Sequence, residues 1–302
     1  MQSLWMLVAS FMFAAMGVCV KLASDEFSTS EIVMYRGIVG TICLFGIIRI
    51  QRGTLKTSMP LAHLWRGLVG VISLWLWFYA IAKLPLATAM TLNYMAPIWI
   101  AVWLFAHGWW HRKNHVEWPL ILAVIMSFVG VALLLRPAFA SNQMGPALVA
   151  LISSVLSAMA YLQVRKLGLA GEPEYRVVFF FSLMNLLAGL GGHALEAGMD
   201  FHRPDGRTIW LLLGLGLLGL GAQIAMTRAY RLGKTLVVAN LQYTGIVFSS
   251  LWGLAVFNDS FDWHSWVGIA IILGSGIAAT FYNTRSTERG KAIASTDPIA
   301  SE

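Results

Sequence analysis

Apolar runs of close to twenty residues follow one another along most of the chain, separated by short polar segments. A helix of about 20 apolar residues crosses the roughly 30 Å hydrocarbon core of a bilayer. Backbone groups in lipid must be satisfied within the segment, so runs of this length indicate helices and not the roughly ten-residue strands of a barrel. The pattern predicts ten spans, at about residues 4–22, 30–49, 64–82, 87–107, 118–136, 145–165, 175–195, 208–229, 235–257 and 264–283.

The composition agrees with an all-α integral membrane protein. Of the 302 residues, 58% are hydrophobic and 12% are charged, and the mean hydropathy is +0.70. A soluble domain usually carries about 25% charged residues. The first run has no basic segment before it, so it is interpreted as a retained helix and not as a signal peptide. Cys19 and Cys43 both fall inside predicted spans, where we expect them to be small apolar fillers.

Basic residues are divided unequally between the two sides that these spans define. Fifteen of the 21 Lys and Arg residues, Arg66 among them, fall on the side that holds both ends of the chain. Positive residues mark the cytoplasmic side, so we expect a multi-pass protein of the inner or plasma membrane with both termini in the cytoplasm. The net charge of +7 then reflects topology and not nucleic-acid binding.

The second half of the chain repeats features of the first. At an offset of 149 residues, TLNYMAP (91–97) aligns with NLQYTGI (240–246), so that an Asn-Tyr pair matches a Gln-Tyr pair. At an offset of 145, MYRGIVGT in the second span aligns with FFFSLMNL in the seventh. These registers divide the ten spans into five and five.

An odd number of spans in each half decides their relative orientation. A half that begins in the cytoplasm ends outside, so the second half enters the membrane in the opposite sense. Inverted repeats of this kind build secondary transporters, with the substrate site near the bilayer midplane between the halves. We expect two five-helix repeats, at residues 1–140 and 141–284, and a disordered cytoplasmic tail at 285–302.

The chain also resembles a known family. A YRG element early in the second span, and YAIAKLPLATAMTLNYMAPIW from Tyr79 to Trp99, are similar to segments of EamA-type drug/metabolite transporters, and the resemblance covers about residues 4–283. It implies transport of small organic solutes, mostly outward, through a cavity lined chiefly by spans 1, 3, 4, 6, 8 and 9. It implies neither a cofactor nor enzymatic activity. Glycines in the last span leave a monomer and a homodimer open.

Polar and aromatic groups inside the spans are the candidates for substrate binding, because polar side chains in a membrane are costly. An alternative for the amides of Asn93 and Gln242 is hydrogen bonding between helices. An alternative for Trp75 and Tyr79 in the third span is contact with lipid. Pro97 removes a backbone hydrogen bond and is expected to kink the fourth span. The candidates are Tyr94, Tyr243, Asn93, Gln242, Asn240, Thr91, Arg36, Trp75, Tyr79, Gln163 and Gln223.

Arg36 is the one basic candidate. A guanidinium can hold a carboxylate or phosphate through two parallel hydrogen bonds. The alternative is an ion pair with Glu31 or Asp25 near the outer mouth, or a side chain that reaches outward to the headgroups. Its partner in the repeat is Phe181, so the internal symmetry does not account for it.

Two other patterns suggest different chemistry. GLGLLG at 214–219 fits a dinucleotide-binding fingerprint, but it lies inside one apolar span without the required strand or acidic residue, so we expect it to serve close helix packing. His107, His111 and His115 recur at four-residue spacing and would suit a membrane metal enzyme. The surrounding aromatic and basic residues favour an interfacial turn.

The favoured function is therefore secondary transport, as an exporter of amino-acid-like or aromatic metabolites working by alternating access. An uptake carrier or exchanger, for example of nucleoside-like solutes, is the alternative, and a metal enzyme is less favoured. The expected partners are a small-molecule substrate and the lipid bilayer. No Asp or Glu lies deep in any predicted span, which weakens a conventional cation-coupled mechanism.

Overall fold

A computed structural model describes most of the chain, and every regular element among the described residues is a helix. The predicted fifth span lies largely outside the described residues, and the polar tail lies wholly outside them. The helices are η1 (Gln2–Leu4), α1 (Trp5–Ala23), α2 (Thr29–Ile50), α3 (Pro60–Lys83), α4 (Leu86–Asn93), α7 (Met144–Leu169), α8 (Glu174–Leu195), α9 (Gly206–Leu232) and α11 (Thr244–Phe257). The described residues are 2–100, 102–103, 122, 125–126, 129–130, 133, 143–196, 201–233, 238, 241–259, 262–275 and 277–278.

Six of these segments are long and apolar enough to cross a membrane, which confirms an all-helical, multi-pass membrane protein. They correspond to the predicted spans 1, 2, 3, 6, 7 and 8. Two shorter apolar helices, Thr244–Phe257 and Trp263–Ser275, fall within the predicted spans 9 and 10. The six long segments are Gln2–Ala23, Thr29–Ile50, Pro60–Lys83, Met144–Leu169, Glu174–Leu195 and Gly206–Leu232.

Local sequence signals set where the helices begin. Ser28 and Glu31 form a capping box at the start of α2, and Asp205 with Thr208 does the same for α9. In each box the side chains satisfy backbone N–H groups that have no partner within the helix. Pro60 occupies the first turn of α3, where its missing N–H costs nothing.

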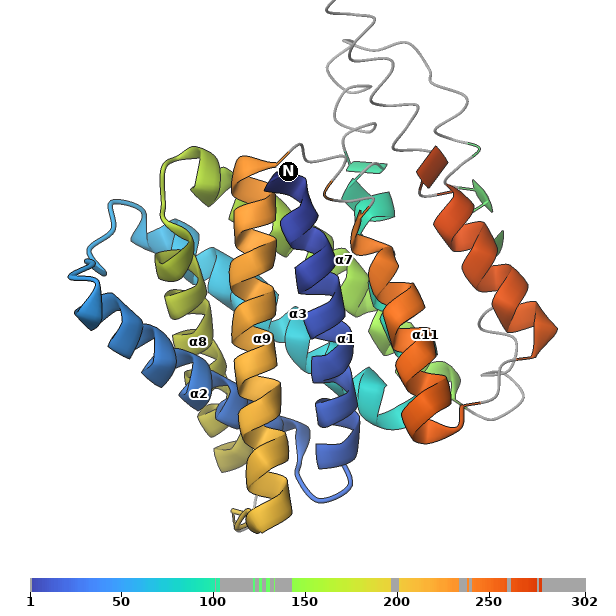
Figure 1. The fold of residues 1–302 in the computed structure, drawn as a ribbon, viewed down its shortest axis with the longest axis horizontal. Coiled ribbons are helices and arrows are strands. Elements are labelled where there is room, and N and C mark those ends of the chain that lie inside the picture. Colours follow the sequence, from blue (N-terminus) through green and yellow to red (C-terminus); the bar gives the residue numbers. More distant parts are fainter. Residues whose placement is uncertain are drawn as a thin grey trace, which may run out of the picture.

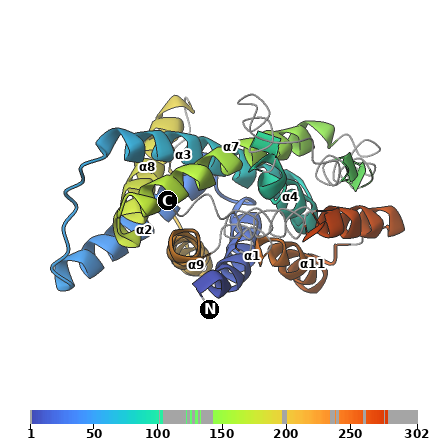
Figure 2. The ribbon, with the colours of Figure 1, turned by 90° about the horizontal axis from the view of Figure 1, so that it is seen from above.

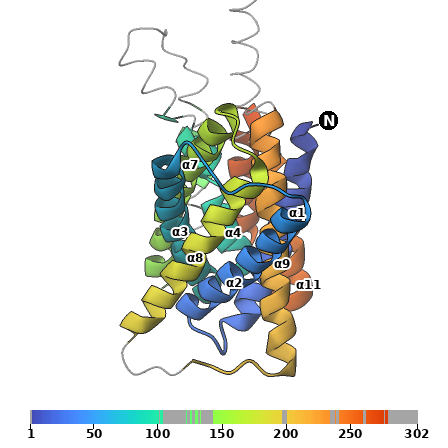
Figure 3. The same cartoon turned by 90° about the vertical axis from the view of Figure 1, so that its left-hand side faces the viewer.

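The bundle is built from helix pairs that join distant parts of the chain (Figure 1). Helix α1 packs along α9 on one side and α11 on the other, and Figure 2 shows these three nearly end-on. Helix α3 packs along α7, and α2 crosses α8, as Figure 3 shows. Each of these pairs combines one helix from residues 1–140 with one from residues 141–284.

The crossing of α2 and α8 depends on glycines in both helices. A Cβ at Gly37 of α2 would overlap the backbone of Leu186, and a Cβ at Gly189 of α8 would lie 2.5 Å from the backbone nitrogen of Met34. Small residues let membrane helices approach closely, and this approach replaces the hydrophobic driving force that lipid cannot supply. The GLGLLG segment has the same role, because it lies within α9 and Gly216 faces Val39 of α2.

A buried carboxylate joins the α2–α3 connection to the start of α8. Glu172 is 4% exposed, accepts a hydrogen bond from Thr57 at 2.5 Å, and pairs with Arg176 at 2.7 Å. His63 Nε2 lies 3.4 Å from the same carboxylate. Burial acts to raise the pKa of Glu172, but the hydrogen bonds from Thr57 and Arg176 and the neighbouring positive charges outweigh it, so the pKa lies below its ordinary value of 4.5.

Gly37→Ala should destabilise the bundle, because the added methyl forces α2 and α8 apart. Overpacking of this kind costs about 1–3 kcal/mol, so we expect a clear fall in the melting temperature of the purified protein in detergent. Gly46→Ala is the matched control. Gly46 lies on the same helix, and a Cβ built there would have no atom of another part of the chain within 4 Å. Equal melting temperatures for the two variants would contradict the glycine crossing.

Glu172→Gln should lower the melting temperature at pH 7, and the difference from wild type should shrink as the pH falls below 4.5 and through the lowered native pKa. A lowered native-state pKa means that the carboxylate stabilises the fold above the unfolded value, and that this stabilisation is lost as the pH falls through the native pKa. Melting curves of both proteins across this range test it. A difference that does not change with pH would rule out the charge of Glu172 as its source.

Candidate functional site

Two helices are interrupted at the tyrosines that the repeat aligns. Helix α4 ends at Asn93, and the backbone turns at Tyr94 and Met95 before a helical turn resumes beside Pro97. Tyr243 is a turn residue immediately before α11. The interruptions are close in space, because a Cβ at Gly245 of α11 would lie 2.5 Å from the hydroxyl of Tyr94.

A cavity of about 40 Å³ lies beside this turn, at the centre of the bundle. Its volume accommodates only about three water molecules. Six helices contribute to its wall, and the wall combines aromatic rings with polar groups. The lining residues are Phe13, Arg66, Gly70, Ser73, Leu74, Trp77, Asn93, Tyr94, Ser157, Ala160, Tyr161, Phe181 and Gln223.

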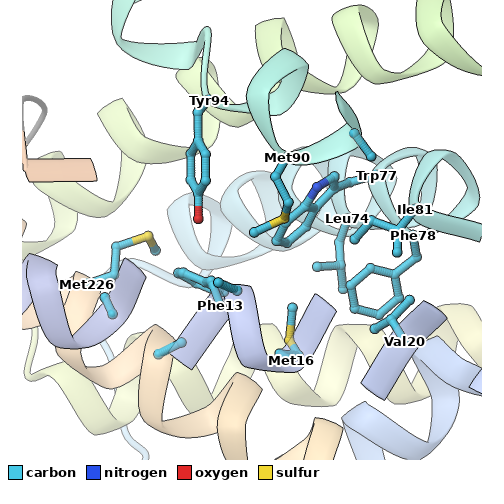
Figure 4. Packing of buried hydrophobic residues seen from close by; sticks show 14 of the residues in the cluster. Phe13, Met16, Val20, Leu74, Trp77, Phe78, Ile81, Met90, Tyr94 and Met226 are labelled. Carbon is cyan, nitrogen blue, oxygen red and sulfur yellow. The ribbon is translucent and has the colours of Figure 1, made fainter. Parts of the chain in front are cut away.

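The aromatic part of the wall consists of Phe13, Trp77, Tyr94, Tyr161 and Phe181. Figure 4 shows Tyr94 extending toward Phe13 and Met226, with Met90 between it and Trp77. Phe13 and Trp77 are in edge contact, with ring centroids 6.1 Å apart. The hydroxyl of Tyr94 is buried without a hydrogen-bond partner. It lies against Gly245 of α11, which is not part of the cavity wall.

A hydrogen-bonded network of serines and an amide forms another part of the wall. The Ser73 hydroxyl lies 2.7 Å from that of Ser157, and Ser153 donates to the Ser73 carbonyl at 2.8 Å. Asn93 donates to Ser153 at 3.2 Å and accepts from Ser157 at 3.3 Å. Asn93 thus joins α4 to α7 and lines the cavity at the same time.

Gln242 forms a second network, on the far side of Tyr161. Its amide nitrogen donates to the Tyr161 hydroxyl at 3.3 Å, and its oxygen accepts from the Tyr230 hydroxyl at 3.3 Å. The rings of Tyr161 and Tyr230 are stacked, with centroids 5.7 Å apart. Of these three residues, only Tyr161 lines the cavity. Tyr243 is also fully buried and lies outside the lining.

Arg66 lines the cavity and is 3% exposed, which corrects its assignment to the basic cytoplasmic side. Its guanidinium carbon lies 4.3 Å from the ring centroid of Phe181, and Nη2 is 3.5 Å from the Gln223 side-chain oxygen. Nε and Nη1 have no hydrogen-bond partner. Seven residues into α3, the side chain folds back into the bundle instead of reaching the membrane surface.

Arg36 is also 3% exposed but does not belong to the cavity wall. Its guanidinium carbon lies 5.2 Å from the ring centroid of Phe181, the residue that the repeat aligns with it. Glu31 is engaged elsewhere, because it accepts a hydrogen bond from the His202 backbone at 2.8 Å. In the described part of the chain no carboxylate forms an ion pair with Arg36 or Arg66.

The remaining candidates occupy different environments. Gln223 lines the cavity, Thr91 is buried with an unpartnered hydroxyl outside it, and Gln163 is half-buried on α7. Trp75 fits against Gly192 of α8, and Tyr79 is 39% exposed on the outer surface of α3. Asn240 lies outside the described residues.

Sequence reasoning did not select Trp77 or Arg66 as cavity residues. Trp75 and Tyr79 share a face by helical spacing, but that spacing does not say which face is turned inward. A usable signal for Arg66 was Gly70, one turn later on the same face of α3. Beside Gly70 a folded-back guanidinium has room.

The metal-enzyme alternative rested on His107, His111 and His115, which lie outside the described residues. Within the described ranges, no group of three His, Cys, Asp or Glu side chains is placed to hold a metal ion. None of the described cavity-lining residues is acidic.

A bundle of membrane-length helices around a small polar and aromatic cavity defines the class of α-helical membrane transporters. The chain belongs to the EamA-like transporter family, whose model matches residues 1–136 and again residues 144–281. The family and the relatives of the chain are transporters and not enzymes.

The curated relatives align over nearly their whole length. The pseudopaline exporter CntI of Pseudomonas aeruginosa is 31% identical over 90% of this chain and 93% of its own. A riboflavin transporter of Vibrio cholerae is 28% identical over 97% of each chain. An S-adenosylmethionine uptake transporter of Rickettsia conorii is 20% identical over 94% of each.

A solved crystal structure shares the fold. It superposes with a TM-score of 0.67 at 18% sequence identity and covers 94% of this chain and 98% of its own. At this identity the likeness concerns the fold alone.

Asn93→Leu should lower the melting temperature, because it leaves Ser153 and Ser157 without their amide partner. Interhelical hydrogen bonds in membranes contribute about 0.6–1.7 kcal/mol, so a loss of a few degrees is expected. Gln163→Leu is the matched amide control on α7, outside this network. If the two variants have the same melting temperature, the Asn93 network does not stabilise the bundle.

Proposed function

We propose that the chain is a secondary transporter that exports a small amino-acid-like or aromatic metabolite across the inner or plasma membrane by alternating access. The cavity carries this proposal, because it lies at the centre of the bundle and is lined from both halves of the chain. Phe13, α3 and α4 supply one part of its wall, and α7, α8 and α9 supply the other. Rings and hydrogen-bonding groups together suit a flat solute with polar substituents.

Two inverted five-helix repeats, divided near residue 140, underlie the proposed mechanism. The double match of the family model, at 1–136 and 144–281, supports this division. The helix pairs support it as well. When the halves are exchanged, α1 becomes α7 and α9 becomes α3, so the α1–α9 pair maps onto the α7–α3 pair. The α2–α8 crossing maps onto itself. Ten spans would place both termini on the same side, and the excess of Lys and Arg there supports the cytoplasm as that side.

The size of the cavity implies that the bundle must open to admit a solute. A volume of about 40 Å³ is far below the roughly 300–1,000 Å³ of typical ligand pockets. In alternating access the two halves rock against each other around a fixed site. The interrupted helices at Tyr94 and Tyr243 face each other between the halves, where such a motion would be centred.

The direction of transport is the finer part of the proposal. The Pseudomonas aeruginosa relative is named an exporter, which supports outward movement. Uptake or exchange is the alternative, and the Rickettsia conorii relative is named an uptake transporter. Accumulation of the solute by energised inside-out vesicles would support export, whereas accumulation only by right-side-out vesicles would support uptake. The transporter is proposed to act as a monomer or homodimer in the bilayer, without a cofactor.

Counterflow in proteoliposomes tests the cavity as the transport site. With amino acids, nucleosides and aromatic metabolites as the panel, we expect Trp77→Ala to reduce counterflow about tenfold or more, because it removes a ring from the wall and enlarges the cavity. Tyr79→Ala is the matched control, an aromatic residue on the same helix that faces outward. Both variants must have melting temperatures well above the assay temperature, so that both are folded during the measurement.

Two results would contradict the proposal. The first is wild-type protein that catalyses counterflow of no solute in the panel. The second is a Trp77→Ala variant that transports at the rate of Tyr79→Ala, since the cavity beside Trp77 would then not be on the transport path.

A further inference from the structure

The cavity wall holds a positive charge that the described protein does not neutralise. Arg66 is buried, it lines the cavity, and two of its three nitrogens lack a hydrogen-bond partner. Its one hydrogen bond, to the neutral amide of Gln223, is long at 3.5 Å. A buried and unpaired guanidinium costs several kcal/mol in a low-dielectric interior. A charge retained at such a cost is expected to have a ligand.

The surroundings of Arg66 keep its guanidinium at the cavity instead of at the membrane surface. A Cβ at Gly70 would overlap Nη1 of Arg66, so glycine at this position leaves the space that the side chain occupies. The ring of Phe181, 4.3 Å from the guanidinium carbon, gives a cation–π contact on the cavity side of α8. The guanidinium is therefore held in place before any ligand binds.

A second buried guanidinium strengthens the positive potential at this point. Arg36 contacts the same Phe181 ring at 5.2 Å, and Gly219 of α9 makes room for it, since a Cβ there would lie 2.8 Å from Nε. Like charges repel in a medium of low dielectric constant, so this arrangement is unfavourable while the site is empty. An anion between Arg66 and the cavity would relieve the repulsion.

We propose that Arg66 binds a carboxylate group of the transported solute, so that the cargo is an acidic metabolite. This inference rests on the proposed function in one respect, that the cavity is the transport site. The planar guanidinium presents two parallel N–H donors that match the two oxygens of a carboxylate. The carboxylate supplies the charge that the wall lacks.

The rest of the wall specifies the remainder of the solute. The rings of Phe13, Trp77 and Tyr94 offer an apolar surface. A single guanidinium lines the cavity, which suits one singly charged oxyanion better than a doubly charged phosphate. The solute is thus a carboxylic acid with a flat, largely apolar body.

Binding of matched acids and amides tests this proposal directly. The probes are indole-3-acetate, phenylacetate and N-acetyltryptophan, each with its neutral amide, and phenyl phosphate as the phosphate arm. Ligand-induced shifts in melting temperature report binding without transport. We expect at least one acid to bind about tenfold or more tightly than its amide, the scale of a charge-assisted pair. Absence of binding by all the acids, or equal binding of acid and amide, would overturn the proposal. Preferential binding of phenyl phosphate would overturn the choice of carboxylate.

Substitutions at Arg66 separate charge from geometry. Arg66→Gln should abolish the preference for acid over amide, and Arg66→Lys should restore it in part, because lysine keeps the charge without the planar fork. Gly70→Ala should also weaken acid binding, since it displaces the guanidinium and removes no charge. Arg49→Gln, an exposed arginine on α2, is the matched control and should bind as wild type. An unchanged acid preference in Arg66→Gln would refute the proposal that Arg66 binds the carboxylate.

The stability of Arg66→Gln distinguishes a lost ligand contact from misfolding. Removing a buried unpaired charge should leave the melting temperature unchanged or raise it. Counterflow with the same probes keeps the two proposals apart. Counterflow of the acids at the same rate in wild type and Arg66→Gln would refute carboxylate binding by Arg66 and leave the transporter standing. Acid binding that depends on Arg66, with no counterflow of any probe, would support carboxylate binding by Arg66 and refute the proposal that the cavity is the transport site.

Discussion

A bilayer offers no hydrogen-bond partners, and this constraint shapes the whole molecule. Backbone groups are satisfied within helices, and polar side chains must find partners in the interior of the bundle or remain unpaired at a cost. Most of the polar groups at the centre do find partners, as the serine and Asn93 network between α3, α4 and α7 shows. Other buried polar atoms have no partner, among them Arg66 Nε and Trp77 Nε1 in residues that line the cavity, and Arg36 Nε and Thr91 Oγ1 in residues outside the lining.

Close helix contacts allow this polar centre to form. Lipid does not drive apolar helices together, so the bundle relies on glycines such as Gly37 and Gly189, which bring the α2 and α8 backbones into close contact. The same small residues leave space for the large side chains that face inward. Gly70 leaves space for Arg66, Gly219 for Arg36, and Gly245 for Tyr94. Glycine thus determines both the packing of the bundle and the positions of its unpaired polar groups.

Relatives of this fold carry names that indicate different solutes, among them pseudopaline, riboflavin and S-adenosylmethionine. Membership of the family therefore establishes a transporter but leaves the cargo to the lining of the cavity. In this chain the lining combines rings with one guanidinium and no described acidic group. That charge balance supports the proposal of an acidic cargo more specifically than the family does.

The sequence by itself determined the membrane class, the six long helical spans that the structure describes and the family, because twenty-residue apolar runs and the segment around Tyr94 depend only on local order along the chain. It also selected Asn93, Tyr94 and Gln223 as polar groups of interest. Only the tertiary structure decided which side of each helix faces the cavity. It placed Trp77 and not Trp75 or Tyr79 at the wall, and it placed Arg66 inside the bundle and not at the cytoplasmic surface. The physical reason is that helical spacing groups residues on a face, whereas packing against other helices decides where that face points.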